Sequence, residues 1–397
     1  MSHMACCDWT QCKRCGLCLS RCPVLGLGEE EARGEIRLLL DGEKAPKVFS
    51  RCTLCFNCNQ YCPEGLRPHE LILTRILEAR KERIPAFIPY LLNGLPGPNF
   101  FHDLYAALDS EEKAILSRWT EPPAGGGEFL FVGCVGRLSC LDLENSRVLS
   151  ALPKYGPPDL CCGELHYRAG SWNAFSDRME ASLARLSAIK AKRMILYCGS
   201  CATFFGRILP KVYGKTLPFE TISLYEWLWE KLREKSLAIK KPLSFTAAIH
   251  ESCYATELGP DFSGALSGLY ESAGVNCVKL PHHGSGNLSC GAASVVRNSN
   301  IFKSLLPAQW RKYRDVKEAG VGEVALNCPG CFITMSFTSR ISGVRLRYMP
   351  ELLLSALGDD ISRPLSGRMG LIARTGAKRW RLLFQKAGPE LLSALRP

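Results

Sequence analysis

A run of four cysteines and a proline occurs twice in the first 63 residues of the chain, each time with the spacing Cys-x2-Cys-x2-Cys-x3-Cys-Pro. The eight cysteines are Cys12, Cys15, Cys18, Cys22, Cys52, Cys55, Cys58 and Cys62. Thiols at such short intervals can surround one face of a compact metal group, and Pro23 or Pro63 then turns the chain away. This repeated run predicts a small module that folds around thiolates bound to metal.

The spacing is typical of [4Fe–4S] sites in which the fourth cysteine of each run binds the cluster of the other run. The predicted ligand groups are therefore Cys12, Cys15, Cys18 and Cys62, and Cys52, Cys55, Cys58 and Cys22. Zinc is the alternative, because paired Cys-x2-Cys elements also form tetrahedral sites. The third cysteine at the same interval and the Cys-Pro ending, both present twice, favour iron–sulfur clusters and hence electron transfer.

Composition indicates a reducing compartment. The chain has 397 residues, enough for two or three domains, and its 21 cysteines follow metal-type spacings rather than those of a short secreted disulfide scaffold. We expect a cytoplasmic protein, because neither a signal peptide nor an apolar stretch of membrane-spanning length is evident. The net charge of +12 is not accompanied by a nucleic-acid-binding motif, so no nucleic-acid partner is expected.

Five segments are predicted along the chain. Residues 1–83 form the helical two-cluster module, with one short helix within residues 29–47 and another beginning at Pro68. Residues 84–128 form a connector with one or two short helices and a flexible, glycine-rich end. Residues 129–235 and 244–358 form two similar lobes, and residues 359–397 form a basic tail.

The two lobes follow from an internal repeat. In each, an apolar strand leads to a cysteine, a Cys-Gly turn follows, and a second strand ends in Cys-x2-Cys before a helix. Strands that alternate with helices predict parallel α/β units, and ligands of such units bind beyond the carboxyl ends of the strands. The first lobe offers Cys134, Cys161, Cys162, Cys198 and Cys201, and the second offers Cys253, Cys290, Cys328 and Cys331.

Ser289 stands in the second lobe where the first of the adjacent cysteines would be, so that only four thiols remain there. Cys140 and Cys277 fall outside the pattern and are expected to be small core residues. Cys6 and Cys7 are expected to be spare surface thiols.

On these motifs the chain resembles the cysteine-rich CCG-domain family of heterodisulfide reductases. It is similar to the fused form, in which a two-cluster ferredoxin module precedes two CCG domains, as in one of the heterodisulfide reductase subunits and in the iron–sulfur subunit of anaerobic glycerol-3-phosphate dehydrogenase. The resemblance covers residues 10–358. It implies a helical ferredoxin module followed by two duplicated parallel α/β lobes.

The resemblance also implies a function. In the family a complete CCG motif holds a noncubane [4Fe–4S] cluster, a role that falls here to the five thiols of the first lobe. The second lobe, which departs at Ser289, could hold an ordinary [4Fe–4S] cluster, zinc or nothing. The leading hypothesis is an electron-transfer subunit of a multi-subunit anaerobic oxidoreductase. The alternatives are a catalytic disulfide reductase that uses the first lobe and a zinc-stapled interaction scaffold.

Several other features bear on partners. No Gly-rich nucleotide fingerprint is found, so hydride chemistry would belong to another subunit, such as a flavoprotein. If the tail lies on a membrane, the expected electron-exchange partner is a cytochrome- or quinone-linked membrane subunit. His250, His282 and His283 lie near the cysteines of the second lobe and are expected to be hydrogen-bond donors to ligands or plain loop residues. The aromatic residues of 224–230 are expected to be core residues. The basic tail could lie on a membrane surface, dock on a partner subunit or remain solvated.

Overall fold

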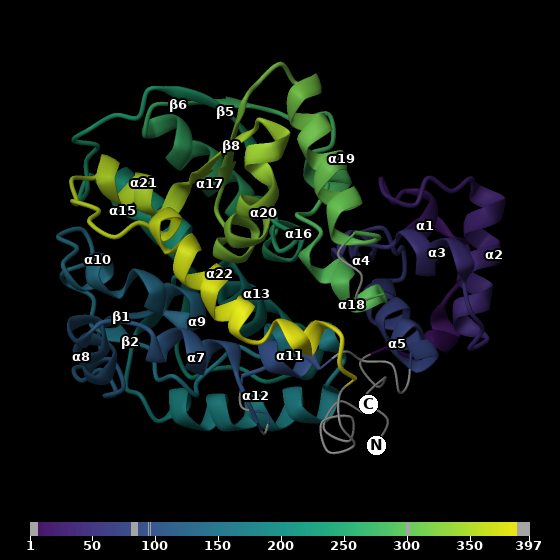
Figure 1. Ribbon diagram of the computed structural model, residues 1–397, viewed down its shortest axis with the longest axis horizontal. Helices are drawn as coiled ribbons and strands as arrows, with labels where there is room; N and C mark the ends of the chain where they lie inside the picture. The colour runs from purple at the N-terminus through teal and green to yellow at the C-terminus, as the bar shows by residue number, and fades with distance from the viewer. Residues whose placement is uncertain (1–6, 81–85, 94, 96, 299–301, 387–397) are drawn as a thin grey trace.

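The structure, a computed structural model, describes residues 7–80, 86–93, 95, 97–298 and 302–386. Figure 1 shows the N-terminal module beside a larger body made of two stacked halves. Cys6 lies outside the described residues, whereas Cys7 is partly exposed.

The N-terminal module is helical. Its elements are the 3₁₀ turn Trp9–Gln11, α1 (Leu17–Ser20), α2 (Glu29–Leu40), α3 (Pro46–Arg51), α4 (Asn57–Gln60) and α5 (Pro68–Arg80). The expectation of a helix from Pro68 is confirmed. The expectation of one short helix within residues 29–47 is wrong, because α2 has 12 residues and α3 begins within the same stretch. Gly42 adopts a φ of +81° after α2, and Pro46 supplies a suitable first residue for α3.

The connector contains three helices, α6 (Phe87–Leu91), α7 (Phe100–Ala106) and α8 (Ser110–Arg118), where one or two were expected. Side-chain caps mark the starts of α7 and α8, although the segment is rich in turn residues. Asn99 accepts hydrogen bonds from the first turn of α7, and Asp109 forms a capping box with Glu112 at the start of α8. Gly125 and Gly126, both at positive φ, lead the chain into the first strand.

Each lobe is built on a four-stranded parallel sheet, which confirms the predicted α/β class. The strand orders are β2-β1-β3-β4 and β6-β5-β7-β8. In the first lobe the strands are β1 (Glu128–Phe131), β2 (Lys154–Tyr155), β3 (Arg193–Leu196) and β4 (Glu220–Ser223). In the second they are β5 (Phe245–His250), β6 (Val275–Val278), β7 (Glu323–Leu326) and β8 (Arg345–Tyr348).

The two strands predicted in each lobe form the centre of its sheet. Strands β1 and β3 pair in parallel, with Phe129 opposite Met194, and β5 and β7 pair likewise, with Ile249 opposite Ala325. The outer strands were not predicted. They are short and only partly apolar, and the pattern of β8, Arg-Leu-Arg-Tyr, is typical of a sheet edge.

Helices cover the sheets and complete the core. In the first lobe they are α9 (Gly133–Gly136), α10 (Cys140–Glu144), α11 (Glu164–Ala169), α12 (Trp172–Ser187), α13 (Gly199–Thr203), α14 (Leu209–Tyr213) and α15 (Leu224–Arg233). In the second they are α16 (Ala255–Leu258), α17 (Pro260–Ser272), α18 (Val295–Asn298), α19 (Leu305–Glu318), α20 (Pro329–Ser342) and α21 (Met349–Ala356). Tyr225 and Trp227 of α15 are buried, as expected for core residues.

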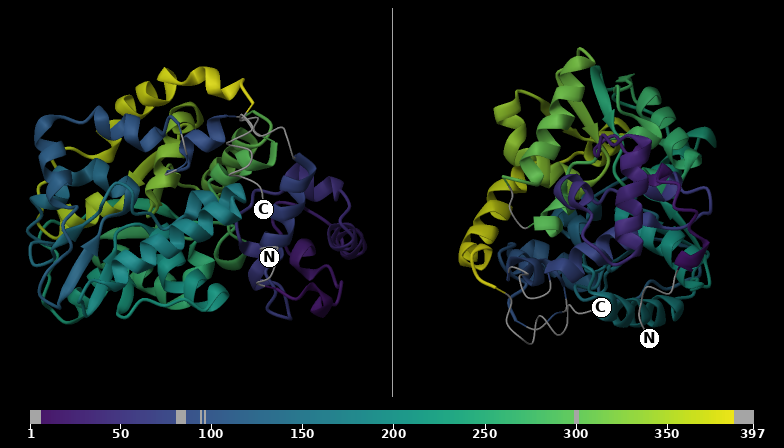
Figure 2. Two further views of the ribbon diagram at one scale, coloured as in Figure 1. Left: turned by 90° about the horizontal axis from the view of Figure 1, so that it is seen from below. Right: turned by 90° about the vertical axis from the view of Figure 1, so that its right-hand side faces the viewer.

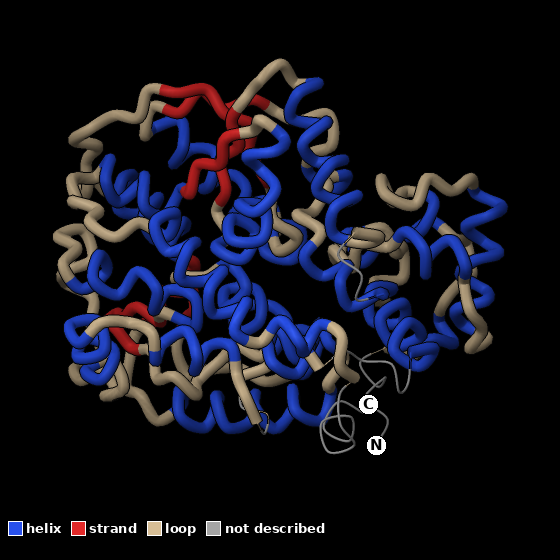
Figure 3. Tube along the Cα trace, viewed as in Figure 1, coloured by secondary structure: helices blue, strands red, loops and turns tan. Residues whose placement is uncertain are grey.

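The carboxyl ends of the two sheets face each other across the interface between the lobes. Helix α20 packs on α9, and α13 packs on α16, so segments that directly follow strands of opposite lobes meet. Figure 3 shows the two sheets as separate groups of strands, one in the upper half of the body and one in the lower half. The N-terminal module lies across the side of this junction, as the right-hand view of Figure 2 shows.

The basic tail folds back onto the chain itself, which none of the three expectations for it included. Helix α22 (Met369–Lys378) packs on α7, and the Arg379 Nε lies 3.4 Å from a carboxylate oxygen of Asp103. Arg368 pairs with Glu112 of α8. Several cations of the tail are thus neutralised by the connector. No described helix is long and apolar enough to span a membrane.

Candidate functional site

The eight cysteines of the N-terminal runs surround two small cavities. Cys12, Cys15, Cys18 and Cys62 line the first. Cys22, Cys52, Cys55 and Cys58 line the second, together with Cys18. The fourth cysteine of each run therefore lies with the first three of the other, which is the arrangement that the spacing predicted.

The two cysteine loops turn in the same way. Arg14 and Gly16 in the first loop, and Leu54 and Phe56 at the equivalent places in the second, all have positive φ between 53° and 75°. Left-handed backbone costs roughly 1–2 kcal/mol per non-glycine residue, so the loops hold a conformation that local preference disfavours. Gly16 is required where it stands, because a Cβ there would lie 2.7 Å from the Arg33 backbone nitrogen. The loops point their thiols inward at this cost.

Burial makes these thiols poor nucleophiles and suitable metal ligands. Burial raises the pKa of Cys18 to about 12 and that of Cys22 to about 11, and neighbouring thiols contribute to both shifts. Such groups stay protonated at neutral pH unless a cation replaces the proton. The donor sets of both cavities therefore fit iron–sulfur clusters.

All five thiols predicted in the first lobe come together. Cys134 lies in α9 after β1, Cys161 and Cys162 precede α11, and Cys198 caps α13 after β3. Their side chains form a continuous series of hydrogen-bonded pairs. The pairs are Cys134–Cys161, Cys161–Cys162, Cys162–Cys201 and Cys201–Cys198. The turn depends on Gly163, which has a φ of +70° and is surrounded by Phe175 and Met179.

Hydrogen bonds among these thiols shift their pKa values in opposite directions. Hydrogen bonds from Cys134 and Cys162 lower the pKa of Cys161, whereas the hydrogen bond to Cys161 raises the pKa of Cys134. The hydrogen bond with Cys201 likewise lowers the pKa of Cys198, so contacts among the thiols favour the thiolate form at both positions. Five converging sulfur donors exceed what a tetrahedral ion needs, so the set fits a larger group than a single zinc ion.

The four thiols of the second lobe also converge. Cys290, Cys328 and Cys331 are linked by side-chain hydrogen bonds, and Cys253 lies near Cys290 and Cys328. The turn at Gly291 repeats that at Gly163, with a φ of +77°. Ser289 is buried beside them, and its Oγ accepts a hydrogen bond from the Gly291 backbone N–H at 3.3 Å.

A buried ammonium group beside these thiols supports the binding of an anionic group. Lys312 of α19 is fully buried, and its Nζ has no hydrogen-bond partner. Its nearest carboxylate, on Asp315, is 3.9 Å away. Burial lowers the pKa of Lys312 to about 8, while Asp315, Glu251 and the thiols of Cys331 and Cys290 oppose that shift. Thiolates bound to metal would supply the missing counter-charge, so the second set also fits a cluster.

Sequence reasoning missed a cationic residue between the sites. Arg168 of α11, in the first lobe, donates from Nη2 to the Cys253 sulfur of the second lobe at 3.0 Å. It also donates from Nη1 to the Leu54 carbonyl of the N-terminal module at 2.8 Å. An arginine five residues after a Cys-Gly turn carries no recognisable motif, and only the folded chain brings these partners together.

None of the three predicted histidines contacts a cysteine thiol through a hydrogen bond that the structure describes. His250 is buried at the end of β5, and neither ring nitrogen has a partner. The ring of His282 is 2.7 Å from Asp315, and that of His283 is 2.8 Å from the Leu280 carbonyl oxygen. Among the described residues, no group of three or more His, Cys, Asp and Glu side chains is arranged to hold a single metal ion.

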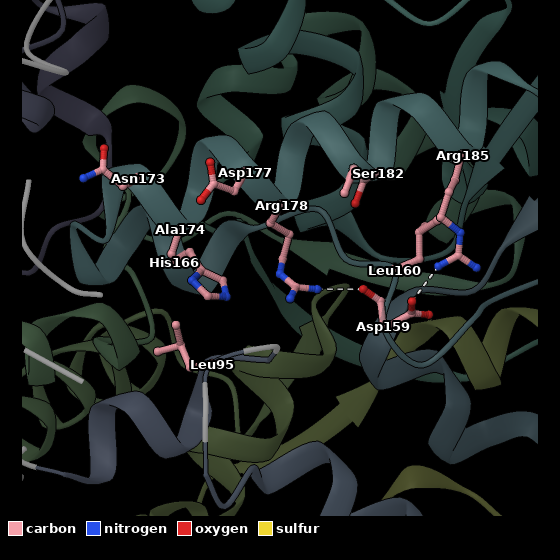
Figure 4. Close-up of a pocket in the computed structure, with 11 residues that line it drawn as sticks. Leu95, Asp159, Leu160, His166, Asn173, Ala174, Asp177, Arg178, Ser182 and Arg185 are labelled. Carbon is pink, nitrogen blue, oxygen red and sulfur yellow. Dashed lines mark hydrogen bonds and ion pairs between the residues drawn. The ribbon is translucent and has the colours of Figure 1, made fainter. Parts of the chain in front are cut away.

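An open cavity of about 450 Å³ is lined by Asp159 and Leu160, which directly precede Cys161, and by residues of α12, but by none of the five cysteines. Figure 4 shows Arg178 and Arg185 reaching from α12 toward Asp159, with His166 to the left of Arg178. Ser182, also on its wall, donates to the Cys161 carbonyl at 3.0 Å. Burial lowers the pKa of His166. The cavity thus lies directly behind the loop that carries Cys161.

Comparisons with known proteins define the class. Residues 8–66 match the 4Fe-4S dicluster domain, and residues 129–206 and 247–336 each match the cysteine-rich domain, CCG. The chain therefore belongs to the iron–sulfur proteins that join one dicluster domain to two CCG domains, and the predicted resemblance is confirmed.

Individual relatives sharpen this assignment. The chain is 24% identical over 365 residues to a subunit of dihydromethanophenazine:CoB–CoM heterodisulfide reductase from Methanosarcina acetivorans, covering 81% of this chain and 86% of that protein. The corresponding subunit from Methanosarcina mazei is 23% identical over the same shares. A shorter match, 33% identical over 108 residues, covers 23% of this chain and 26% of the glycolate oxidase iron-sulfur subunit of Escherichia coli. The chain is homologous to these subunits.

Proposed function

We propose that the protein is the electron-transfer subunit of a larger oxidoreductase complex. The observation that carries the proposal is the convergence of 17 cysteines into four groups, two in the N-terminal module and one in each lobe. Iron–sulfur clusters bound there would supply one-electron chemistry. The proposed cofactors are two [4Fe–4S] cubanes in the N-terminal module, a noncubane [4Fe–4S] cluster in the first lobe and a [4Fe–4S] cluster in the second.

Contacts between domains support a spatial order of these sites. The loop that carries Cys52, Cys55 and Cys58 docks on the second lobe, where Asn57 donates to the Asn287 carbonyl at 2.9 Å. The second lobe in turn faces the first, since Tyr254, next to Cys253, lies 3.9 Å from where a Cβ on Gly199, next to Cys198, would be. The second lobe thus contacts both the N-terminal module and the first lobe, a suitable place for a relay.

Partner subunits complete the proposal. The relatives are named as subunits of a heterodisulfide reductase and of glycolate oxidase. We infer that this chain exchanges electrons with a flavoprotein or with a cytochrome- or quinone-linked membrane subunit, in the cytoplasm or at the inner face of the membrane. Trp380 and Phe384, exposed beyond α22, are available for such a contact.

The first test is the iron and acid-labile sulfide content of anaerobically purified protein, with EPR on the same sample. About sixteen irons per chain would fit four [4Fe–4S] groups. Cys62→Ser is expected to alter the cluster of the Cys12 run, and Cys22→Ser that of the Cys52 run. Zinc without sulfide would instead support an interaction scaffold and contradict electron transfer.

The cavity behind Cys161 favours a second function, reduction of a disulfide at the first lobe. Its wall offers two arginines and a buried histidine, and Ser182 on the same wall bonds to the backbone of Cys161. The test is turnover of disulfides with reduced viologen as electron donor. Turnover that is lost in Cys161→Ser would support this function, whereas rates equal to those without protein would exclude it for the disulfides tested.

A further inference from the structure

Arg168 lies where the three domains meet. It belongs to α11 of the first lobe, yet its guanidinium contacts a cysteine of the second lobe and a cysteine loop of the N-terminal module. Its side chain is 7% exposed. Bulk water therefore does little to screen its charge from the Cys253 sulfur.

Several contacts fix the guanidinium in place. Its Nε donates to Glu164, one turn earlier on α11, and the Tyr254 hydroxyl donates to the same carboxylate oxygen at 2.5 Å. The guanidinium carbon lies 4.5 Å from the centre of the Phe56 ring and 5.2 Å from that of the Tyr254 ring. Lysine would keep the positive charge and could still donate to the Cys253 sulfur, but it lacks the planar group that stacks between the two rings.

We propose that Arg168 is a positioning residue that raises the reduction potential of the cluster bound by the second lobe, through its hydrogen bond to Cys253. The proposal rests on the proposed function, in that it requires a cluster at Cys253, Cys290, Cys328 and Cys331. Reduction adds one electron to the cluster and breaks no bond. A fixed positive charge at a ligand sulfur stabilises the more negative, reduced state. No proton needs to accompany the electron, because arginine remains protonated.

The position of Arg168 lets a residue of the first lobe influence the reduction potential of the second-lobe cluster. The second lobe has serine at position 289 in place of a fifth cysteine and receives instead a cation from the first lobe. Its potential is therefore set by a residue of the domain that it faces. Because Arg168 also binds the Leu54 carbonyl, the same residue ties the relay to the cluster loop of the N-terminal module.

The test is an EPR-monitored redox titration of the full-length, anaerobically purified protein. Arg168→Met is expected to lower the ratio of reduced to oxidised second-lobe cluster at a given potential by about tenfold, which is about 59 mV for one electron. Glu164→Gln, which removes the opposing negative charge and keeps the acceptor oxygen, should shift the ratio the other way. Arg168→Lys should restore most of the wild-type ratio.

Arg137→Met is the matched control. Arg137 is also a buried arginine of the first lobe and stacks on a ring, that of Tyr105 at 5.1 Å, but it bonds to the Gly156 carbonyl. This variant should lose stability. Its ratio of reduced to oxidised second-lobe cluster at a given potential should stay within twofold of the wild-type ratio. If Arg168→Met does not hold iron, the upward shift in Glu164→Gln and the near-normal value in Arg168→Lys still decide the question.

Two outcomes would overturn the inference. An unchanged second-lobe potential in Arg168→Met and Glu164→Gln, or shifts of the same sign in both, would leave Arg168 a merely structural residue while the proposed function stands. If Cys328→Ser changes neither iron content nor EPR signals, the second lobe holds no cluster, and both the inference and the relay fail.

Discussion

A cysteine's chemistry in this chain is decided by its neighbours rather than by its burial. Cys140 and Cys198 are both buried, but Cys198 lies among four other thiols. Cys140 faces only the Glu112 carbonyl oxygen, 4.0 Å from its sulfur, and burial raises its pKa to about 11. Its expected place as a small core residue agrees with this environment.

Cys140→Ala is therefore expected to keep the full iron content and to lower the free energy of unfolding by about 1 kcal/mol, since it removes one buried atom from the core. Cys198→Ala should lose the first-lobe cluster. Iron analysis and thermal unfolding of the two variants, measured side by side, check this. Loss of iron in Cys140→Ala would contradict the assignment of the thiol groups.

Glu351 gives the protein a pH-dependent stability. This carboxylate of α21 accepts a hydrogen bond from the Leu365 backbone N–H at 2.6 Å, and burial raises its pKa to about 7. The folded state then binds a proton more tightly than the unfolded state, whose carboxyl titrates near 4.3. Its favourable contribution is complete below the unfolded pKa and is lost as the pH rises through about 7.

Glu351→Gln should remove this dependence. Relative to wild type, the variant is expected to gain stability as the pH rises from about 4.5 to 7, by up to about 3 kcal/mol. The difference in unfolding temperature between the two proteins, followed across that pH range, is the measurement. A constant difference would show that Glu351 titrates normally.

At the scale of elements, two helices of the lobes end at glycines with a left-handed backbone. Gly274 follows α17 at a φ of +89°, and a Cβ there would lie 2.3 Å from the Leu243 backbone oxygen. Gly214 ends α14 at a φ of +62°, with open space around its missing side chain. The two positions share a left-handed backbone and differ in packing.

Gly214→Ala should therefore cost about 1 kcal/mol, the penalty of a left-handed alanine. Gly274→Ala should cost about 3 kcal/mol or more, because a backbone atom must also move. Denaturant unfolding of the two variants separates these contributions. Equal losses would mean that the Leu243 segment yields without cost.

For the whole molecule, a partly buried ion pair joins the N-terminal module to the second lobe. Arg67 bonds to Glu257 through two nitrogens, each 3.2 Å from a carboxylate oxygen, and to Glu70 at 2.8 Å. Arg297 donates to the Phe49 and Ser50 carbonyls at the same interface. These contacts, distant in sequence, hold a cysteine loop against the second lobe.

A double-mutant cycle of Arg67→Met and Glu257→Gln is expected to give a coupling energy of about 1–3 kcal/mol. Each single variant removes one charge of the pair and should slow electron transfer from the N-terminal module to the lobes. Unfolding free energies and stopped-flow reduction kinetics provide the two readouts. Additive losses would show that the pair does not hold the domains together.

The sequence by itself determined the local chemistry of this protein. Cysteine spacing acts over a few residues, so it predicted both N-terminal groups and the members of each lobe's set. The repeat predicted the central strands, because a buried parallel strand is a continuous apolar run. The edge strands, the full set of three connector helices and the docking of the tail depended on weaker or longer-range signals.

The tertiary structure decided what lies between the sites. The contact of Arg168 with Cys253 spans 85 positions, and that of Arg67 with Glu257 spans 190. Neither residue carries a local pattern, and each gains its partner only when separate domains pack and exclude water. The structure likewise decided that Lys312 would be buried near the second lobe's thiols, with no hydrogen-bond partner for its Nζ and Asp315 3.9 Å away. The spacing of the cysteines thus determines which thiols form each group, whereas the charges around each group are set by contacts between domains.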